Sequence, residues 1–293
     1  MVRRILMLPT AVRPAIRIMV LISLLAACGP AQLRRTAEIA SPVSTAIAAA
    51  PTASSIAGDP AQMPPMVLGV QTHFSQGWPA SALMQAQQVS APMLRDSLPW
   101  AEGEKTRGSY SLNGPAAQNL AAACTAGERL LLTVVPANPL YDSGQWVSSP
   151  AGNAAFADYL AALADRFGPC LAAIEVGNEL NGTGTMAYPA GADKSAAYVR
   201  TIKTVRARIG GRAAILGGSS NMIATGFLKT LFFSGLLGAV DGVVVHPYRT
   251  RAEGLDVELA GLNAAMDAAG RRVPIWASEF SADTTDQPLA AGE

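Results

Sequence analysis

Histidine, cysteine and charge are all scarce in this chain of 293 residues. Two histidines are too few for a histidine-rich metal site, and three cysteines are too few for a disulfide-dense scaffold. The 22 Lys and Arg barely exceed the 21 Asp and Glu, which argues against a nucleic-acid-binding protein. Half of the residues are hydrophobic, so a chain disordered throughout is excluded. What remains is a globular enzyme or a binder of neutral molecules, and we expect neither a metal nor a cofactor.

The N-terminus, residues 1–28, has the pattern of an export signal. Four arginines flank or precede the uncharged apolar run Ile18–Ala27, which is much shorter than the roughly 20 residues that span a bilayer. The run ends in Leu25-Ala26-Ala27-Cys28, which resembles the lipobox of bacterial lipoproteins. We predict a lipoprotein signal peptide with lipidation at Cys28, which would anchor the exported chain to a bacterial membrane, the outer one in a cell that has two. The domain would face the periplasm or the exterior. An ordinary secretory signal with a chance cysteine is the alternative.

Residues 29–65 differ in composition from the rest of the chain. They are rich in Ala, Pro, Ser and Thr and contain no aromatic residue. Such a segment buries too little apolar area to offset the entropy lost on ordering. We predict a disordered tether between the membrane and a domain at residues 66–293.

Short apolar runs alternate with helical patterns in the predicted domain. The predicted strands are Val67–Phe74, Pro92–Leu98, Arg129–Val135, Leu171–Gly177, Ala213–Gly218, Asp241–His246 and Val273–Glu279. The predicted helices are Ser81–Val89, Gly114–Ala123, Asn153–Arg166, Lys194–Arg208, Ala224–Leu231 and Glu258–Ala268. This alternation predicts an α/β fold with a parallel sheet, either doubly wound or a (β/α)8 TIM barrel. No G-x-G-x-x-G follows the first strand, which disfavours a dinucleotide-binding fold.

Polar and aromatic residues gather where the predicted strands end. In strand order they are Gln71, His73 and Trp78; Arg95, Asp96 and Trp100; Asn138 and Tyr141; Asn178 and Glu179; Asn221; His246 and Tyr248; Trp276 and Glu279. Chemistry in a barrel takes place at these strand ends. Aromatic rings suit the apolar faces of sugars, and amides, imidazoles and carboxylates suit the hydroxyls, so the set predicts a carbohydrate substrate.

Two glutamates, Glu179 and Glu279, each close an apolar strand. A carboxylate at a buried strand end is costly unless it is paired or used. Glycoside hydrolysis uses two carboxyls: one protonates the leaving oxygen and the other attacks or activates water. One such glutamate would be explained equally well by an ordinary ion pair, whereas two in matching contexts indicate a glycosidase.

These segments, taken in order, resemble the clan A retaining glycoside hydrolases, which are built on (β/α)8 barrels. Asn178-Glu179 matches the end of the clan's fourth strand, and Glu279 matches the nucleophile that ends its seventh. Residues 94–100 (LRDSLPW) resemble the second strand, where an arginine supports the nucleophile, although Ser97 replaces an aspartate often found there. His246-Pro247-Tyr248 matches the sixth strand. Residues 69–74 (GVQTHF) resemble family 39-type members, some of which are endoglycosidases of bacterial exopolysaccharides.

The resemblance implies that Glu179 is the general acid/base and Glu279 the nucleophile of a double displacement with retention of configuration. The further substrate-binding or supporting residues that it implies are Asn178 at the sugar 2-hydroxyl, Arg95 and Tyr248 at Glu279, His246 in the same subsite, and His73, Asn138 and Trp276. Trp276 could instead pack in the core. Glu175 lies deeper in its strand than Glu179, so we expect a buried structural partner, with an arginine as one candidate, rather than a catalyst.

Cys124 and Cys170 are predicted to form a disulfide. Cys124 ends the helix before the third strand, and Cys170 immediately precedes the fourth, so both should lie at the N-terminal face of a barrel. Export permits oxidation, and lipidation of Cys28 leaves an even pair. Two buried free thiols are the alternative.

The residues after the seventh predicted strand indicate whether the barrel has its eighth strand. Residues 280–293 contain Asp, Thr and Pro, which are typical of a loop. The segment is also too short for an eighth strand and its helix. We therefore expect a TIM barrel truncated after the seventh strand, a fragment with weak or no activity, unless residues 29–65 supply a strand. Two rival functions are a non-catalytic carbohydrate-binding lipoprotein and a metal-dependent barrel hydrolase.

Overall fold

The computed structural model describes residues 66–249, 251 and 253–280, so the predicted signal peptide, the lipidation site Cys28 and the tether lie outside the described residues. The strands are β1 (Val70–Gln71), β2 (Met93–Ser97), β3 (Arg129–Val134), β4 (Leu171–Val176), β5 (Ala214–Asn221), β6 (Gly242–His246) and β7 (Ile275–Ala277). The α-helices are α1 (Ser81–Gln88), α2 (Trp100–Gly103), α3 (Pro115–Thr125), α4 (Pro150–Phe167), α5 (Lys194–Ile209), α6 (Thr225–Phe233) and α7 (Leu255–Ala268). Each predicted strand and helix is present; the short helix α2 was not expected.

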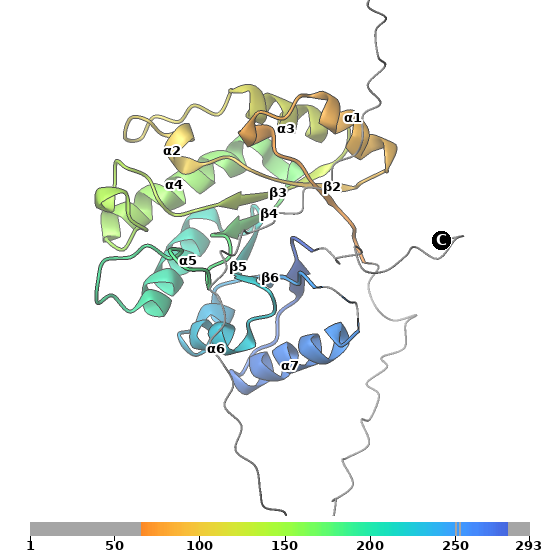
Figure 1. Cartoon of the computed structure of the whole chain (residues 1–293). Helices are drawn as coiled ribbons and strands as arrows, with labels where there is room; N and C mark the ends of the chain where they lie inside the picture. The colour runs from red at the N-terminus through yellow and green to blue at the C-terminus, as the bar shows by residue number, and fades with distance from the viewer. Residues whose placement is uncertain (1–65, 250, 252, 281–293) are drawn as a thin grey trace, which may run out of the picture. The chain divides into compact units, whose positions relative to one another are not determined.

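The seven strands form one parallel sheet whose order is the chain order, from β1 to β7. A doubly wound sheet would reverse its strand order partway, so this order selects the barrel. Figure 1 shows the strands in the middle, with α1, α3 and α4 above them and α6 and α7 below. The described residues thus form a TIM-barrel-like fold with seven strands, and within them no strand joins β1 to β7, as predicted.

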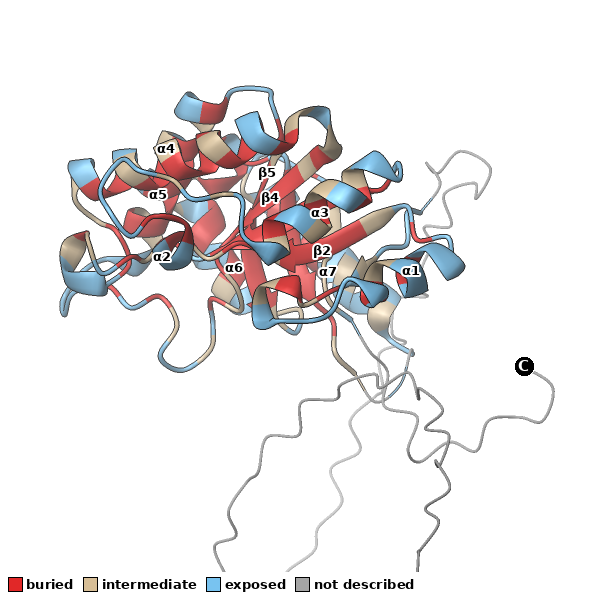
Figure 2. Ribbon diagram, turned by 90° about the horizontal axis from the view of Figure 1, so that it is seen from above, coloured by how far each residue is buried: buried red, intermediate tan, exposed pale blue. Residues whose placement is uncertain are grey.

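Helix α4 shows how the sequence builds the outer layer. Pro150 occupies its first turn, and the side chain of Ser149 accepts a hydrogen bond from the Gly152 amide at 2.9 Å, which satisfies a free donor of the helix end. Phe156 and Leu160 are completely buried, and burial of each such side chain stabilises the fold by about 1.5–3 kcal/mol. In Figure 2 the buried surfaces run along the strands and the inner faces of the helices. Among the described residues, no helix is both long and apolar enough to cross a membrane.

A smaller apolar cluster fills the inside of the curled sheet. It contains Leu131, Ala173, Leu216 and Val244, one residue each from β3 to β6. These side chains form a floor that excludes water from the interior. A layer of polar side chains lies above this floor.

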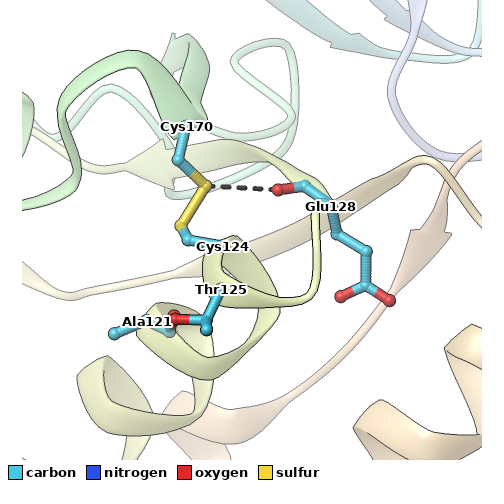
Figure 3. The surroundings of a disulfide bond; sticks show 5 residues. All are labelled: Ala121, Cys124, Thr125, Glu128 and Cys170. Carbon is cyan, nitrogen blue, oxygen red and sulfur yellow. Dashed lines mark hydrogen bonds between the residues drawn. A yellow bond between two sulfur atoms is a disulfide. The ribbon is translucent and has the colours of Figure 1, made fainter.

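Cys124 and Cys170 form the predicted disulfide, with 5.6 Å between their Cα atoms. It joins the end of α3 to the start of β4 (Figure 3). The Cys170 sulfur also lies 3.2 Å from the carbonyl oxygen of Glu128, in the turn that leads into β3. The bond therefore links two successive β/α units at the end of the sheet opposite the polar strand ends.

Candidate active site

A polar layer lies directly above the apolar floor and takes one residue from each of five neighbouring strands. Its members are Arg95 (β2), Thr133 (β3), Glu175 (β4), Ser219 (β5) and His246 (β6). All five are buried, with at most 8% of their surface exposed. Buried polar groups of this kind are costly unless they are hydrogen-bonded, and here they bond to one another.

Glu175 is the centre of this layer and is completely buried. Its Oε2 accepts from Arg95 Nε at 3.0 Å and from Thr133 Oγ1 at 2.9 Å. Its Oε1 accepts from Ser219 Oγ at 2.5 Å and lies 3.3 Å from His246 Nε2. Burial favours the neutral acid, but the charge of Arg95 and the hydrogen bonds from His246 and Arg95 outweigh it and lower the pKa of Glu175 from 4.5 to about 2. The structural role expected for this residue thus has an arginine as one partner.

Glu279 is held from two sides, as the resemblance implies. Arg95 Nη1 lies 2.5 Å from Glu279 Oε1, and the hydroxyl of Tyr248 donates to Oε2. Burial opposes the charge of Arg95, but the carboxylates of Glu175 and Glu279 outweigh this effect and raise its pKa. Burial and the hydrogen bond to Glu279 raise the pKa of Tyr248. Both partners therefore stay protonated and hold Glu279 in one orientation.

Glu179 projects from the turn that follows β4. Gly177 adopts a φ of 87°, a left-handed conformation that suits glycine, and Glu179 itself has a φ of 47°. Such a backbone is strained for a residue with a side chain, and strain of this kind clusters at functional sites. Glu179 Oε1 lies 3.4 Å from His246 Nδ1. The turn thus places Glu179 beside Glu279, with one oxygen of each carboxylate within 4.8 Å of the other.

A pocket of about 290 Å³ opens beside Glu279, on the side of β1 to β3, and Glu179 does not line it. Glu279, Asn178, His73 and Trp100 are among the residues that line it. Asn178 Oδ1 accepts from Arg95 Nη2 at 3.0 Å, which fixes its amide. The ring of His73 packs edge-on against Trp78, with 4.9 Å between the ring centroids.

The loop that presents His73 is fixed by Asp96. Asp96 Oδ2 accepts from Thr72 Oγ1 at 2.7 Å and from the Phe74 amide at 2.8 Å. Asp96 Oδ1 accepts from the Ser97 amide at 2.7 Å. The wall of the pocket is therefore rigid on the β1 side.

Asn138 supports the pocket wall and does not line the pocket. It is 1% exposed; its Nδ2 donates to the carbonyls of Trp100 and Glu104, and its Oδ1 accepts from the Leu140 amide. Sequence reasoning placed it near a strand end correctly but could not show that backbone groups use its whole amide.

Trp276 is half-buried and packs against the apolar floor. It lies beside the apolar floor, two residues before Ser278, and its indole covers Gly242 so closely that a Cβ there would come within 2.6 Å of it. These contacts favour the alternative of packing against the core, and the sugar contact stays a prediction.

Sequence reasoning missed three supporting residues. Glu104 is completely buried and accepts from Trp100 Nε1, the Tyr141 hydroxyl and the Gly108 amide. Ser219 and Ser278 contact Glu175 and His246, respectively. The run of small residues Gly217 to Ser220 was the sequence signal that could have identified Ser219. A register irregularity lies in this run and lengthens β5, which continues to Asn221.

Glu179, His246 and Glu279 bring three potential metal-ligating atoms within 4.8 Å of one another. With only two histidines in the sequence we expected no metal site, but the fold brings these three residues together. However, Arg95 and Tyr248 already bond to Glu279, and a guanidinium at 2.5 Å opposes binding of a second cation.

No protein-family model and no curated protein sequence matches the chain. Among solved structures, a family 39 glycoside hydrolase from the gut symbiont Bacteroides cellulosilyticus WH2 matches with a TM-score of 0.57 and 16% identity, over 74% of this chain and 49% of that chain. A GH39 beta-xylosidase from Caulobacter crescentus matches with a TM-score of 0.55 and 16% identity, over 74% and 54%. An endo-1,4-beta-xylanase from Penicillium canescens matches with a TM-score of 0.54 and 16% identity, over 71% and 67%.

The chain spans about half the length of the first two of these structures. At 16% identity the likeness concerns the fold alone. The structural neighbours nevertheless include the family 39 type that the first strand suggested. The described residues share the TIM-barrel-like fold of these glycoside hydrolases, with seven strands described.

Proposed function

We propose that this chain is a retaining glycoside hydrolase that cleaves O-glycosidic bonds of a poly- or oligosaccharide. The observation that carries the proposal is the separation of Glu179 and Glu279, whose nearest oxygens lie within 4.8 Å. Retaining enzymes hold their two carboxyls about 5–5.5 Å apart, whereas inverting enzymes leave about 6.5–9.5 Å for a water molecule.

The proposed reaction has two displacements. Glu279 attacks the anomeric carbon while Glu179 gives its proton to the departing oxygen, so that a glycosyl ester forms on Glu279 and an alcohol leaves. Glu179 then takes a proton from water, the water oxygen attacks the anomeric carbon, and Glu279 is released. Arg95 and Tyr248 stabilise the carboxylate as leaving group in the second step.

We further propose a neutral sugar as the glycone. Among the described residues that line the pocket, Arg95 is the only Lys or Arg, and its donors bond to Glu175, Glu279, Gln71 and Asn178. Four of its five N–H groups are therefore taken, so this guanidinium cannot form a two-pronged pair with a uronate carboxylate. Aryl xylosides and glucosides should be hydrolysed faster than aryl glucuronides; the reverse order would contradict this proposal.

The test uses the purified chain with aryl glycosides and a set of polysaccharides. Glu279→Gln should abolish turnover. Glu179→Ala should regain turnover of an activated aryl glycoside in azide, because azide attacks the glycosyl-enzyme in place of water, needs no general base, and releases Glu279 as a glycosyl azide forms. NMR of the first product should show retained configuration. An inverted product, or full activity in Glu279→Gln, would refute the mechanism. Activity that survives chelation would dispose of the metal-dependent rival.

A second candidate function is non-catalytic carbohydrate binding by an incomplete barrel. It is favoured by the absence, within the described residues, of a strand between β1 and β7. Glycan binding by the unmodified chain without turnover of any substrate would support it.

We also propose that the chain is exported and lipid-anchored through Cys28, on the basis of residues 1–28 alone. Metabolic labelling with a fatty-acid probe should mark the chain in its bacterial host, and Cys28→Ser should remove the label and release the protein from membranes.

A further inference from the structure

The buried carboxylate of Glu175 has contacts that the proposed reaction does not use. It is completely buried and does not line the pocket, so it cannot touch substrate. Four donors from four different strands meet its two oxygens. A buried carboxylate costs several kcal/mol in lost hydration unless it is fully paired, and an apolar side chain would fill this space more cheaply. Packing alone therefore does not explain a glutamate at this position.

Each oxygen of Glu175 is connected, through one intervening side chain, to one of the two catalytic carboxylates. Oε2 binds Nε of Arg95, whose other end, Nη1, lies 2.5 Å from the nucleophile Glu279. Oε1 lies 3.3 Å from Nε2 of His246, whose other nitrogen, Nδ1, lies 3.4 Å from the acid/base Glu179. Arg95 and His246 are thus each held at one end by Glu175, and each contacts one of the two catalytic carboxylates at the other end.

The contact with Glu175 also decides which nitrogen of His246 carries hydrogen. An ionised carboxylate only accepts hydrogen bonds, so Nε2 must be protonated. The second neighbour of Nε2, Ser278 Oγ at 3.0 Å, can accept from the same nitrogen. Nδ1 then shares one proton with Glu179: it accepts from a protonated Glu179, or it donates as imidazolium to the ionised form. Glu279 lies 3.8 Å from Nδ1, and Arg95 is the neighbouring cation.

We propose that Glu175 is the positioning residue of this site: it directs Arg95 at the nucleophile and fixes the His246 tautomer that faces the general acid. This inference rests on the proposed glycosidase function for its catalytic consequence, but the tautomer is independent of it. Burial opposes the charge of His246, whereas the hydrogen bond and the charges of Glu175 and Glu279 raise its pKa, in the direction that the geometry requires.

The chain is well suited to a direct test because it has only two histidines, His73 and His246. Nitrogen-15 NMR of the imidazoles in the full chain, assigned with His73→Ala, reports both tautomer and titration. We expect His246 to be protonated on Nε2 at high pH. Glu175→Gln should lower its titration midpoint by at least about one pH unit, since 1.36 kcal/mol of lost charge stabilisation corresponds to one unit. Glu128→Gln is the matched control, because Glu128 is also buried but lies at the opposite end of the barrel.

The kinetic arm compares the same variants. Glu175→Gln should lower kcat about 100-fold, the effect expected of a displacement of about 1 Å in a catalytic group, with little change in KM. Glu128→Gln should leave kcat and KM unchanged. A folded Glu175→Gln protein with normal kcat and an unshifted His246 would overturn the proposal. If that variant fails to fold, an Nδ1-protonated neutral His246 in the unmodified chain overturns it instead. A chain without activity on any glycoside refutes the proposed function but leaves the NMR result to decide the role of Glu175.

Discussion

Side chains at the mouth of the barrel differ in whether they face the pocket or hold the wall behind it. Asn178 and Glu279 line the pocket, whereas Asn138 and Glu104 are buried and bond to backbone groups and aromatic side chains around Trp100. An asparagine and a glutamate thus line the pocket, and another asparagine and glutamate support the wall behind it. Substitutions should therefore separate effects on substrate binding from effects on stability.

Asn138→Ala should destabilise the fold and leave KM unchanged. The substitution leaves the Glu104 carbonyl and the Leu140 amide without partners, whereas the Trp100 carbonyl keeps its hydrogen bond from the Glu104 amide. Each buried group left unpaired costs about 1–3 kcal/mol. We expect a loss of about 3 kcal/mol in urea unfolding. Asn153→Ala is the control: it loses one hydrogen bond, from Nδ2 to the Ser149 carbonyl, and should cost about 1 kcal/mol. A raised KM with full stability would instead place Asn138 on the substrate.

Glu175 should make the fold sensitive to acid. Its pKa is about 2 in the folded chain, below its usual value of 4.5, so its stabilisation is fully present above about pH 4.5 and is lost as the pH falls towards 2. His246 has a raised pKa, so its contribution has the opposite sign and is lost as the pH rises through that pKa. Urea midpoints between pH 5 and pH 3 should fall more steeply for the unmodified chain than for Glu175→Gln. Parallel slopes would contradict this prediction.

At the level of strands and helices, the sequence predicted what periodicity and composition encode. All seven strands and six of the helices lie where apolar runs and helical spacing placed them, because these patterns directly reflect burial. The depth of a side chain within the interior, by contrast, depends on register and bulges, which a single strand does not reveal. For this reason Asn138 was assigned to the right strand end but to the wrong surroundings, Trp276 was left between a sugar contact and core packing, and Ser219 was missed.

The turn after β4 should be sensitive to any side chain at Gly177. Gly177→Ala would meet the Leu180 side chain at 2.6 Å and strain a φ of 87°, so it should move Asn178 and Glu179. We expect kcat/KM to fall about 100-fold for a displacement of about 1 Å. Gly127→Ala has a similar φ of 94° but open space around its Cβ, and it should cost stability alone. Equal activity of the two variants would show that this turn tolerates displacement.

The disulfide should stabilise the pairing of the β3 and β4 units. It closes a segment of 46 residues, and loss of that constraint raises the entropy of the unfolded chain by an amount worth about 4 kcal/mol at 25 °C. Cys124→Ala/Cys170→Ala should lower the urea midpoint accordingly and leave kcat/KM nearly unchanged, because the bond lies at the end opposite the active site. Reduction of the unmodified chain should reproduce the effect, and a chelator should not.

For the molecule as a whole, the pairing of the strands predicts a gradient of local stability across the sheet. Within the described residues, β3, β4 and β5 are paired on both sides and deeply buried, whereas β1 and β7 are short and each pair on one side only. Amide exchange reports such differences, because poorly covered strands open at lower free energy. Hydrogen–deuterium exchange should therefore be slowest in β4 and fastest in β1 and β7.

The exchange rate of β7 also bears on activity, because Glu279 follows that strand directly and owes its position to it. If β7 opens readily, Glu279 will leave Arg95 and Tyr248 for part of the time, and turnover will fall in proportion to the open population. Protection of β7 equal to that of β4 would contradict the gradient and would mean that a segment outside the described residues covers the sheet edge. In that case, deletion of residues 29–65 should accelerate exchange in β7 if that segment is the cover, and should leave exchange unchanged if it is only a tether.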